Sequence, residues 1–514
     1  MHLEDLVQTS AAVAATAGRL DKTSKLAALL KRIAPADVPI AIGFLTGWPR
    51  QGKLGVGWAT AVAAREHEPA THSTLELREV DTAFDQLMST RGKNSGGERA
   101  RLLGELFSRA TADEQQFLSA LIVGEVRQGA LDGVIVEAVA KAAGVPADRV
   151  RRAVMMAGDL GVVATAVLGP AGESALAQYQ LEVFRPVQPM LADSEPTVAD
   201  ALTDGTPAVV EWKLDGARIQ VHRRDDRVVV YTRNLNDVTA AVPEVVEAAM
   251  SLPVREVILD GEVIALAADG RPHPFQLTMR RFGRRLDVAE LRATLPLTAF
   301  FFDVLFHDGE SVIDDPLSER LERLDRVAPE SVRVPRIVTA DVEEAARFQA
   351  DALARGHEGV MVKSPSAPYA AGRRGSAWIK VKTARTLDLV VIGVEWGSGR
   401  RKGWLSNVHL GARDPATGSF VMLGKTFKGM TDEILAWQTT ELLAREVRRD
   451  GHVVYVRPEL VVEVAFNEVQ SSSQYPGGVT LRFARVKGYR PDKNAAEADT
   501  IDAVRAFLPD TDTA

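Results

Sequence analysis

The sequence predicts a protein of three domains: an all-α N-terminal domain, a central α+β domain and a C-terminal domain built as a small β-barrel. Its 514 residues correspond to roughly three domains at about 150 residues each. Apolar residues recur at helical spacing up to about residue 175, whereas short alternating runs predominate after residue 208. We place the boundaries at 1–175, a linker at 176–195, 196–385 and 386–514.

The N-terminal region has the pattern of packed amphipathic helices. Segments such as "TSKLAALLKRI" and "VIVEAVAKAAGV" place apolar residues three and four positions apart. The segment "VFRPVQPMLADSEP" then holds Pro186, Pro189 and Pro196, which cannot continue a helix. We therefore predict a helical bundle followed by a linker.

The central and C-terminal regions have the pattern of strands. "AVVEWKLDGARIQVHRRDDRVVVYTRN" gives alternating runs with turns at Asp215-Gly216 and Asp225-Asp226, and helical pieces such as "DVEEAARFQADALARG" follow. Near the C-terminus, "LDLVVIGVEWG", "GSFVMLGKTF" and "HVVYVRPELVVEVAF" surround one predicted helix, "DEILAWQTTELLAREV". Short strands around one helix are typical of a small barrel such as an OB-fold.

Composition excludes several classes of function. The chain has no cysteine, which excludes disulfides, cysteine-bound zinc, iron–sulfur clusters and thiol catalysis. The net charge of −7 excludes a uniformly basic nucleic-acid binder but leaves room for local basic patches. We see no signal peptide and no apolar run long enough to cross a membrane, and we expect a cytoplasmic protein.

Lys213, in "EWKLDGARIQVHR", is the first candidate for chemistry. A lone lysine in a hairpin is usually a surface residue. A lysine can instead be a nucleophile if desolvation or nearby positive charge lowers its pKa. Arg218 is close in sequence, and Lys380 and Lys382 share one face of a predicted strand, "WIKVK". These cations could activate Lys213 and could also bind phosphates.

Two carboxylates and an aromatic run extend this candidate site. Glu262 follows the turn in "LDGEV", and Glu358 precedes the strand "GVMVK". Both could be solvent-facing, or they could share one pocket and hold Mg²⁺ together with phosphate oxygens. In "FFFDVL", Phe301 must point opposite to Phe300 and Phe302, so that one face is core and Phe302 could stack on a nucleobase.

Taken in order, these segments resemble the covalent nucleotidyltransferases, which include ATP-dependent DNA ligases, RNA ligases and mRNA capping enzymes. The resemblance rests on "KLDGAR", "YTRN", "LDGEV", "FFFDVL", "EGVMVK", "WIKVK" and "LRFARVKGYRPDK". It implies a core of antiparallel sheets like those of ATP-grasp proteins. In place of the proline that many relatives have in the last motif, this chain has Ala484.

The resemblance implies a role for each matching position. Lys213 would attack the α-phosphorus of ATP and form lysyl-AMP, Glu211 would bind the adenine edge, and Phe302 would stack on adenine. The implied ligands of the nucleotide and its phosphates are Arg218, Arg233, Glu262, Arg374, Lys380 and Lys382. Glu262 and Glu358 would hold Mg²⁺ or Mn²⁺, and Arg482 and Arg485 would orient pyrophosphate.

The flanking domains favour a DNA ligase over other nucleotidyltransferases. "GEVRQGALDGVIVEAVAKA", which contains Arg127, resembles a segment of the helical DNA-binding domain of larger ligases. The resemblance therefore implies a three-domain ATP-dependent DNA ligase of the archaeal and actinobacterial kind. Its partner would be nicked duplex DNA, bound by a monomer through clusters such as "RPHPFQLTMRRFGRR". We expect a role in replication, repair or recombination.

Two alternatives remain open at this point. An RNA ligase or a GTP-using capping-type guanylyltransferase would share the central motifs but would differ in its nucleotide or its nucleic acid. A non-catalytic nucleic-acid clamp would have lost Lys213, Glu262 or Lys380, and none of these is missing.

Overall fold

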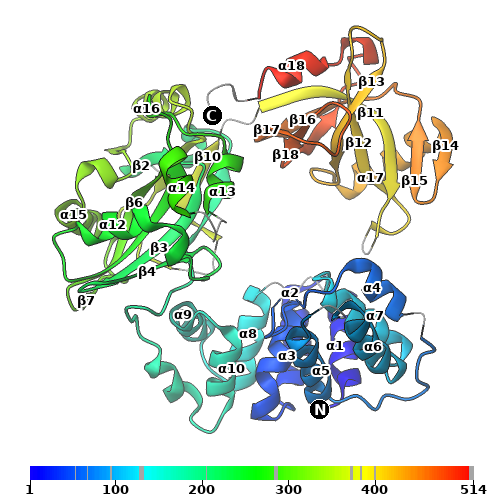
Figure 1. The fold of residues 1–514 in the computed structure, drawn as a ribbon, viewed down its shortest axis with the longest axis horizontal. Coiled ribbons are helices and arrows are strands. Elements are labelled where there is room, and N and C mark those ends of the chain that lie inside the picture. Colours follow the sequence, from blue (N-terminus) through cyan, green and yellow to red (C-terminus); the bar gives the residue numbers. More distant parts are fainter. Residues whose placement is uncertain are drawn as a thin grey trace. The chain divides into compact units, whose positions relative to one another are not determined.

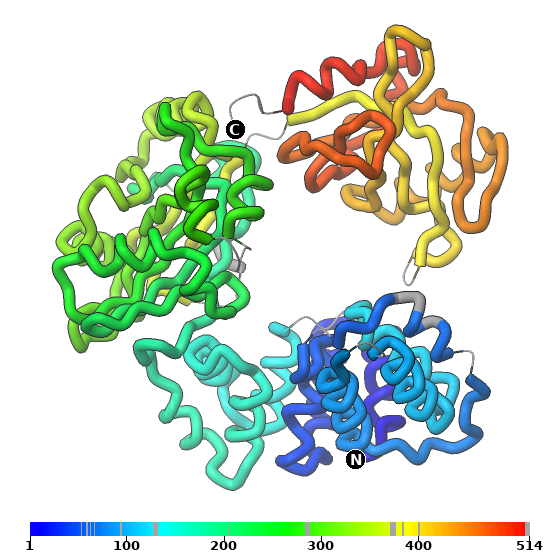
Figure 2. Tube along the Cα trace, in the orientation of Figure 1, coloured from blue at the N-terminus to red at the C-terminus, as the bar shows by residue number. Residues whose placement is uncertain are grey.

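The computed structural model describes residues 1–508 apart from positions 53, 66, 93–94, 127–131, 204, 283–287, 371–373, 383–384 and 399–400, and apart from the side chains at 58, 59, 62 and 374–376. By its internal contacts the chain divides into two compact units. Residues 381–514 make up most of the second unit, and nearly all of the rest belongs to the first. The helices and strands of each unit are shown in Figure 1, and the course of the chain in Figure 2.

The elements that the structure describes in the N-terminal region are all helices, as predicted. Its elements are α1 (Leu3–Ala14), α2 (Arg19–Leu30), η1 (Pro35–Asp37), α3 (Val38–Thr46), α4 (Trp58–Ala64), α5 (Leu77–Ser89), α6 (Ser95–Ser108), α7 (Ala112–Ile122), α8 (Asp132–Ala143), α9 (Ala147–Ala157), α10 (Leu160–Leu168) and η2 (Gly172–Gln178). Helix α7 begins with a capping box between Thr111 and Glu114, which satisfies free N–H groups of its first turn.

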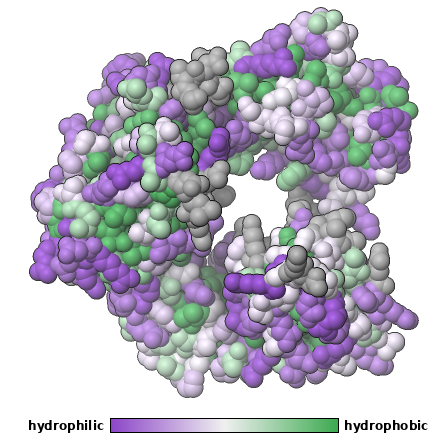
Figure 3. Space-filling view, viewed as in Figure 1, coloured by the Kyte–Doolittle hydropathy of each residue, from purple (hydrophilic) through white to green (hydrophobic). Residues whose placement is uncertain are grey.

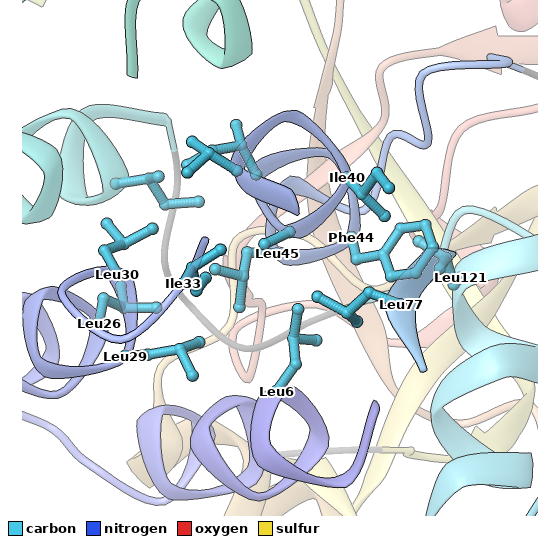
Figure 4. Close-up of a cluster of buried hydrophobic side chains, with 14 of the residues drawn as sticks. Leu6, Leu26, Leu29, Leu30, Ile33, Ile40, Phe44, Leu45, Leu77 and Leu121 are labelled. Carbon is cyan, nitrogen blue, oxygen red and sulfur yellow. The ribbon is translucent and has the colours of Figure 1, made fainter. Parts of the chain in front are cut away.

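Apolar side chains from these helices meet in one core. Leu6 of α1, Leu26 of α2 and Phe44 of α3 are fully buried, and Figure 4 shows them within one cluster of apolar side chains. The ring of Phe44 lies 5.7 Å from that of Phe84 on α5. The three- and four-residue spacing read from the sequence therefore places one face of each helix in a shared core.

The central domain contains two five-stranded sheets, and β2 pairs antiparallel with both of its neighbours in the first, as all strands do in the second. The first has the order β1-β10-β9-β2-β8 and the second β4-β3-β5-β6-β7. Their strands are β1 (Leu191–Glu195), β2 (Ala208–Lys213), β3 (Ala217–Arg224), β4 (Arg227–Thr232), β5 (Glu256–Ala265), β6 (Leu297–His307), β7 (Glu310–Ser311), β8 (Arg336–Thr339), β9 (Gly359–Lys363) and β10 (Arg374–Lys382).

Helices cover these sheets. Helix α16 (Val342–Ala354) packs on the first sheet, and α12 (Pro243–Met250) and α15 (Leu317–Val327) pack on the second, as Figure 1 shows. The remaining elements are α11 (Val198–Ala201), η3 (Thr239–Ala241), α13 (Phe275–Phe282), α14 (Val288–Thr294) and η4 (Glu330–Val332). Phe301 of β6 is fully buried in the second core, and Phe302 faces the other side, so the prediction for this run is confirmed.

The turn after Lys213 carries the chain from one sheet to the other. Strand β2 ends at Lys213 in the first sheet, and β3 begins at Ala217 in the second. Gly216 lies against β5, where an added Cβ would come within 2.5 Å of the Ile264 methyl group and closer still to the Val263 carbonyl oxygen. Only glycine allows this close approach of two backbones.

The segment predicted as a linker is packed against the central domain. Val183, Val187 and Met190 are buried in a cluster with Met155 and Met156 of α9 and with core residues such as Leu305. Alternate side chains on one face of β3 form hydrogen bonds with the backbone of this segment. Arg218 donates to the Met190 carbonyl at 2.6 Å, Gln220 Oε1 accepts from Val187 N–H at 2.8 Å, and His222 Nδ1 accepts from Phe184 N–H at 2.9 Å.

The C-terminal domain is a curved antiparallel sheet with one long helix. Its elements are β11 (Arg385–Trp396), β12 (Leu405–Arg413), β13 (Phe420–Thr426), α17 (Asp432–Leu443), β14 (Glu446–Asp450), β15 (Val453–Val456), β16 (Val461–Phe466), β17 (Glu468–Ser471), β18 (Val479–Arg482), β19 (Arg485–Tyr489), η6 (Ala495–Glu497) and α18 (Ile501–Arg505). The long strand β11 pairs with β12, β15 and β16, and Leu435 of α17 is buried in the core beneath it.

The surface is mostly hydrophilic on the face drawn in Figure 3, where apolar side chains are scattered among polar ones. Among the residues that the structure describes, no helix is both long and apolar enough to span a bilayer.

Candidate active site

Lys213 lies at the last position of β2, where the two sheets of the central domain connect. It pairs with Gly359 of β9, and its carbonyl oxygen accepts from the Glu358 N–H at 3.0 Å. Its ammonium forms an ion pair with the Glu358 carboxylate. The Lys213 side chain is only 21% exposed, so it is not the surface lysine that its sequence context alone would suggest.

The charges around Lys213 are negative. Burial by itself would lower the pKa of Lys213, but the carboxylates of Glu358 and Glu262 outweigh it, and the pKa is raised. The expectation that nearby cations lower this pKa is therefore not met, because the neighbouring charges are carboxylates. The reason is geometric, because Arg218 points toward Asp260 on the neighbouring strand.

Arg218 is held in a buried polar network. Its guanidinium makes two hydrogen bonds to the Asp260 carboxylate at 3.0 and 2.6 Å, and the Tyr369 hydroxyl donates to the same carboxylate at 2.7 Å. The Met190 N–H donates to the Tyr369 hydroxyl at 3.0 Å. Arg218 also lies 5.4 Å from the ring centroids of both Phe302 and Trp378. The network fixes these rings relative to β3.

Glu211 lies two residues before Lys213 on the same face of β2. Its carboxylate is buried and forms an ion pair with Lys363 of β9. Burial raises the pKa of Glu211, although the Lys363 ammonium opposes this effect. The ammonium lies 4.4 Å from the centre of the Phe302 ring and 4.2 Å from that of Trp378. Glu211 and Phe302 are thus linked through Lys363.

Glu262 lies beside the turn that follows Lys213. It is directly opposite Arg218 in the β3–β5 pair, and its Oε1 accepts from the Gly216 N–H at 3.2 Å. Burial raises its pKa to about 7 against the opposing effect of Lys213 and Arg218. With Glu358 it places two carboxylates next to the Lys213 amine.

This pair of carboxylates fits what Mg²⁺ requires. Within the described part of the chain, no three His, Cys, Asp or Glu side chains form a metal-binding group. Mg²⁺ binds by one or two carboxylates together with phosphate oxygens and waters, so a closed protein cage is not needed. Glu262 and Glu358 have the right chemistry, and phosphate would have to supply the remaining oxygens.

The other predicted site residues lie on several different elements. Lys380 and Lys382 follow Trp378 at two-residue steps on β10, so they share its face. Arg233 is exposed just beyond the end of β4. Arg482 ends β18 and contacts Glu468 at 3.3 Å, and Arg485 begins β19. Arg127 and the side chain of Arg374 lie outside the described residues.

Four residues of this network were not predicted as site residues from the sequence: Asp260, Lys363, Tyr369 and Trp378. Asp260 and Lys363 stand inside segments that carried the resemblance, "LDGEV" and "EGVMVK". A second charge in each motif was the signal that could have identified them. Tyr369 gave no signal, because Asp260 and Met190, which form hydrogen bonds with its hydroxyl, are separated from it by more than 100 residues.

A helical N-terminal region, a core of two antiparallel sheets with a buried lysine at their junction and an OB-like C-terminal domain define a three-domain nucleotidyltransferase. Comparisons with known proteins then identify the family. Family models described as "ATP dependent DNA ligase domain", "ATP dependent DNA ligase C terminal region" and "DNA ligase N terminus" match residues 189–382, 401–493 and 59–140.

The chain belongs to the ATP-dependent DNA ligase family and is an enzyme of that family. It is 57% identical to a "Probable DNA ligase" of Anaeromyxobacter sp. (strain Fw109-5), over 99% of this chain and 98% of the relative. It is 55% identical to proteins of the same name from Sorangium cellulosum (strain So ce56), over 99% of this chain and 95% of the relative, and from Mycobacterium sp. (strain KMS), over 99% of both chains.

Solved structures agree on the fold. The structure titled "Pmar-Lig_PreS3" covers 94% of this chain and 99% of its own, with a TM-score of 0.63 at 18% identity. A second, "Pmar-Lig_Pre.", covers 95% and 99% with the same TM-score at 17% identity. At this identity the likeness concerns the fold alone.

Proposed function

We propose that this protein seals nicks in duplex DNA with ATP as cosubstrate, through a lysyl-AMP intermediate at Lys213. The observation that carries the proposal is the buried amine of Lys213 at the junction of the two sheets, next to the carboxylates of Glu358 and Glu262. Glu211 and Phe302, which both contact Lys363, are the candidates for holding adenine. The names and full-length identity of the relatives support DNA as the nucleic acid.

The first step is attack of the Lys213 amine on the α-phosphorus of ATP. A nitrogen–phosphorus bond forms, the bond from the α-phosphorus to the bridging oxygen breaks, and pyrophosphate leaves. The amine must first lose a proton to solvent, because an ammonium has no free electron pair. Since Glu358 and Glu262 raise the pKa of Lys213, the ion pair with Glu358 has to open before attack.

The second and third steps transfer AMP and join the strands. A 5′-phosphate oxygen of the nick attacks the AMP phosphorus, and Lys213 leaves and takes up a proton. The 3′-hydroxyl then loses its proton to solvent and attacks the 5′-phosphorus, and AMP leaves. Each step replaces one bond at phosphorus by another, so catalysis depends on positioning and on offsetting charge.

We propose that Glu262 and Glu358 hold Mg²⁺ together with the nucleotide phosphates. Bound there, the ion would neutralise phosphate charge during the reaction. The chain's own contribution is to keep two carboxylates fixed by strand ends and a backbone N–H, as the Gly216 contact to Glu262 does. Lys380 and Lys382 are the candidates for binding phosphate oxygens from β10.

An adduct assay tests the proposal. We expect α-labelled ATP with Mg²⁺ to label the protein, Lys213→Ala to abolish the label, and the exposed Lys25→Ala to leave it unchanged. The labelled protein should then seal nicked DNA. Label that persists in Lys213→Ala would contradict the assignment of the nucleophile, and preferential labelling by GTP or sealing of nicked RNA alone would favour the alternatives.

A further inference from the structure

We propose that Lys363 determines nucleotide specificity: through its ion pair with Glu211 it selects a 6-aminopurine over a 6-oxopurine. The inference rests on the proposed adenylation of Lys213, and it assigns a role to a residue that the sequence motifs did not single out. It concerns which base is accepted and leaves the chemistry at phosphorus unchanged.

The geometry around Lys363 gives it few partners. It ends β9 directly opposite Val209, so its side chain lies diagonally across from Glu211 on one face of the sheet. The Lys363 side chain is 1% exposed and that of Glu211 is 4% exposed. Apart from Glu211, the ammonium faces the rings of Phe302 and Trp378, which stand almost perpendicular to each other at 5.9 Å.

An ammonium buried in this way must keep a counter-charge. A buried charge without a partner is strongly unfavourable, whereas the pair with Glu211 and two aromatic faces compensates it. The same argument applies to Glu211, because burial favours its protonated form and Lys363 favours its ionised form. The other charged groups that face Glu211 are Arg336 of β8 and Asp303 of β6.

The ionisation state of Glu211 decides which base edge it can bind. An ionised carboxylate can only accept hydrogen bonds, so it suits the 6-amino group of adenine and repels the 6-oxo group of hypoxanthine or guanine. A protonated carboxyl can donate and therefore tolerates a 6-oxo group. By keeping Glu211 ionised, Lys363 thus makes the site prefer a 6-aminopurine to a 6-oxopurine.

The test compares ATP with ITP, which presents a 6-oxo group in place of the 6-amino group. The rate of adduct formation is measured over a range of nucleotide concentrations, so that KM and kcat are separated, for the wild type, Lys363→Met and Lys363→Arg. We expect the ATP-to-ITP ratio to fall at least tenfold in Lys363→Met and to be largely kept in Lys363→Arg. A folded Lys363→Met with the wild-type ratio would overturn the inference.

A double variant keeps the inference testable if the single substitution prevents folding. If Lys363→Met does not fold, Glu211→Gln combined with Lys363→Met removes both charges, and its amide can donate or accept. That double variant should also lose the preference for ATP, and a wild-type ratio in it would overturn the proposal.

Arg355→Met is the matched control, because the Arg355 guanidinium lies 5.4 Å from the Trp212 ring, on the side of β2 opposite to Glu211. It should keep the wild-type ratio, and an equal loss of preference there would count against Lys363. A wild-type protein that forms no AMP adduct would instead refute the proposed function.

Discussion

At the scale of single residues, the site depends on charges that are paired below the surface. Arg218 and Asp260 illustrate this, because the Asp260 side chain is 2% exposed and accepts from both Arg218 and Tyr369. Removing one member of such a pair leaves the other charge buried without compensation. The role implied for Arg218 in binding the nucleotide therefore depends on a carboxylate that does not face Lys213.

Asp260→Asn should weaken both the fold and the site. We expect a loss of about 3 kcal/mol in unfolding free energy, because Arg218 would keep its charge without a carboxylate. Adduct formation should fall as well, since Arg218 contacts the rings of Phe302 and Trp378. Denaturant unfolding and the adduct assay measure the two effects.

Glu256→Gln is the control for this substitution, because Glu256 pairs with Arg224 at the exposed end of the same strands. It should cost no more than about 1 kcal/mol. Equal losses in the two variants would show that burial of the Asp260 pair has no special effect.

His222 should make the stability of the central domain depend on pH. Burial lowers its pKa to about 3, and its Nδ1 must stay unprotonated to accept from the Phe184 N–H. Because the folded pKa lies below the unfolded value near 6.5, stability is full above pH 6.5 and is lost as pH falls toward 3.

His222→Asn should reduce this loss of stability between pH 6.5 and 3, while lowering stability at neutral pH. Unfolding followed by tryptophan fluorescence at a series of pH values measures both effects. The exposed His72→Asn should leave the profile unchanged. The interpretation would be wrong if the profile of His222→Asn had the wild-type slope.

At the scale of elements, the strand β3 serves two purposes. One face of it binds the segment from Phe184 to Met190 through Arg218, Gln220 and His222. The turn that precedes β3, at Gly216, sets the position of Lys213 relative to Glu262. The segment from Phe184 to Met190 therefore helps to position Arg218 and does more than connect two domains.

Gly216→Ala should displace this turn. The added methyl group would collide with β5, so we expect a cost of about 2 kcal/mol and at least a tenfold loss of adduct formation. Gly97→Ala, in α6, is the control because an added Cβ there meets nothing within 4 Å. It should be neutral or slightly stabilising. Normal adduct formation by Gly216→Ala would contradict the importance of the close approach.

At the scale of the whole molecule, the chain must bind a polyanion although its net charge is −7. Contacts to phosphates then have to come from local cationic clusters, and these contacts release counterions from the DNA. The proposal of nicked DNA as substrate therefore makes a prediction about salt.

Binding to nicked duplex should weaken steeply with salt. If the protein contacts six or more phosphates, its affinity should fall by roughly a thousandfold or more between about 50 and 200 mM salt. An intact duplex of the same length should give a similar slope, because phosphate contacts carry no sequence information. Fluorescence anisotropy measures both, and a slope near zero would contradict phosphate-dominated binding.

Sequence by itself determined the classes of element and singled out Lys213 as the candidate nucleophile. Spacing along the chain is enough for this, because helical and strand periods are local. A run such as Phe300–Phe302, for example, places its middle ring on the face opposite to the other two. The sequence also placed Glu211, Glu262, Glu358 and Phe302 in motifs, and the structure shows Glu358 and Glu262 beside Lys213 and Glu211 close to Phe302 through Lys363.

Only the tertiary structure decided the partners of these residues. The turn at Gly216 joins two sheets and forms no hairpin, because β2 pairs with β9 and β8 while β3 pairs with β4 and β5. Arg218 is directed to Asp260, Lys363 to Glu211, and Tyr369 to a backbone group 179 positions away. The electrostatics of the site follow from such long-range pairings, and no local pattern in the chain encodes them.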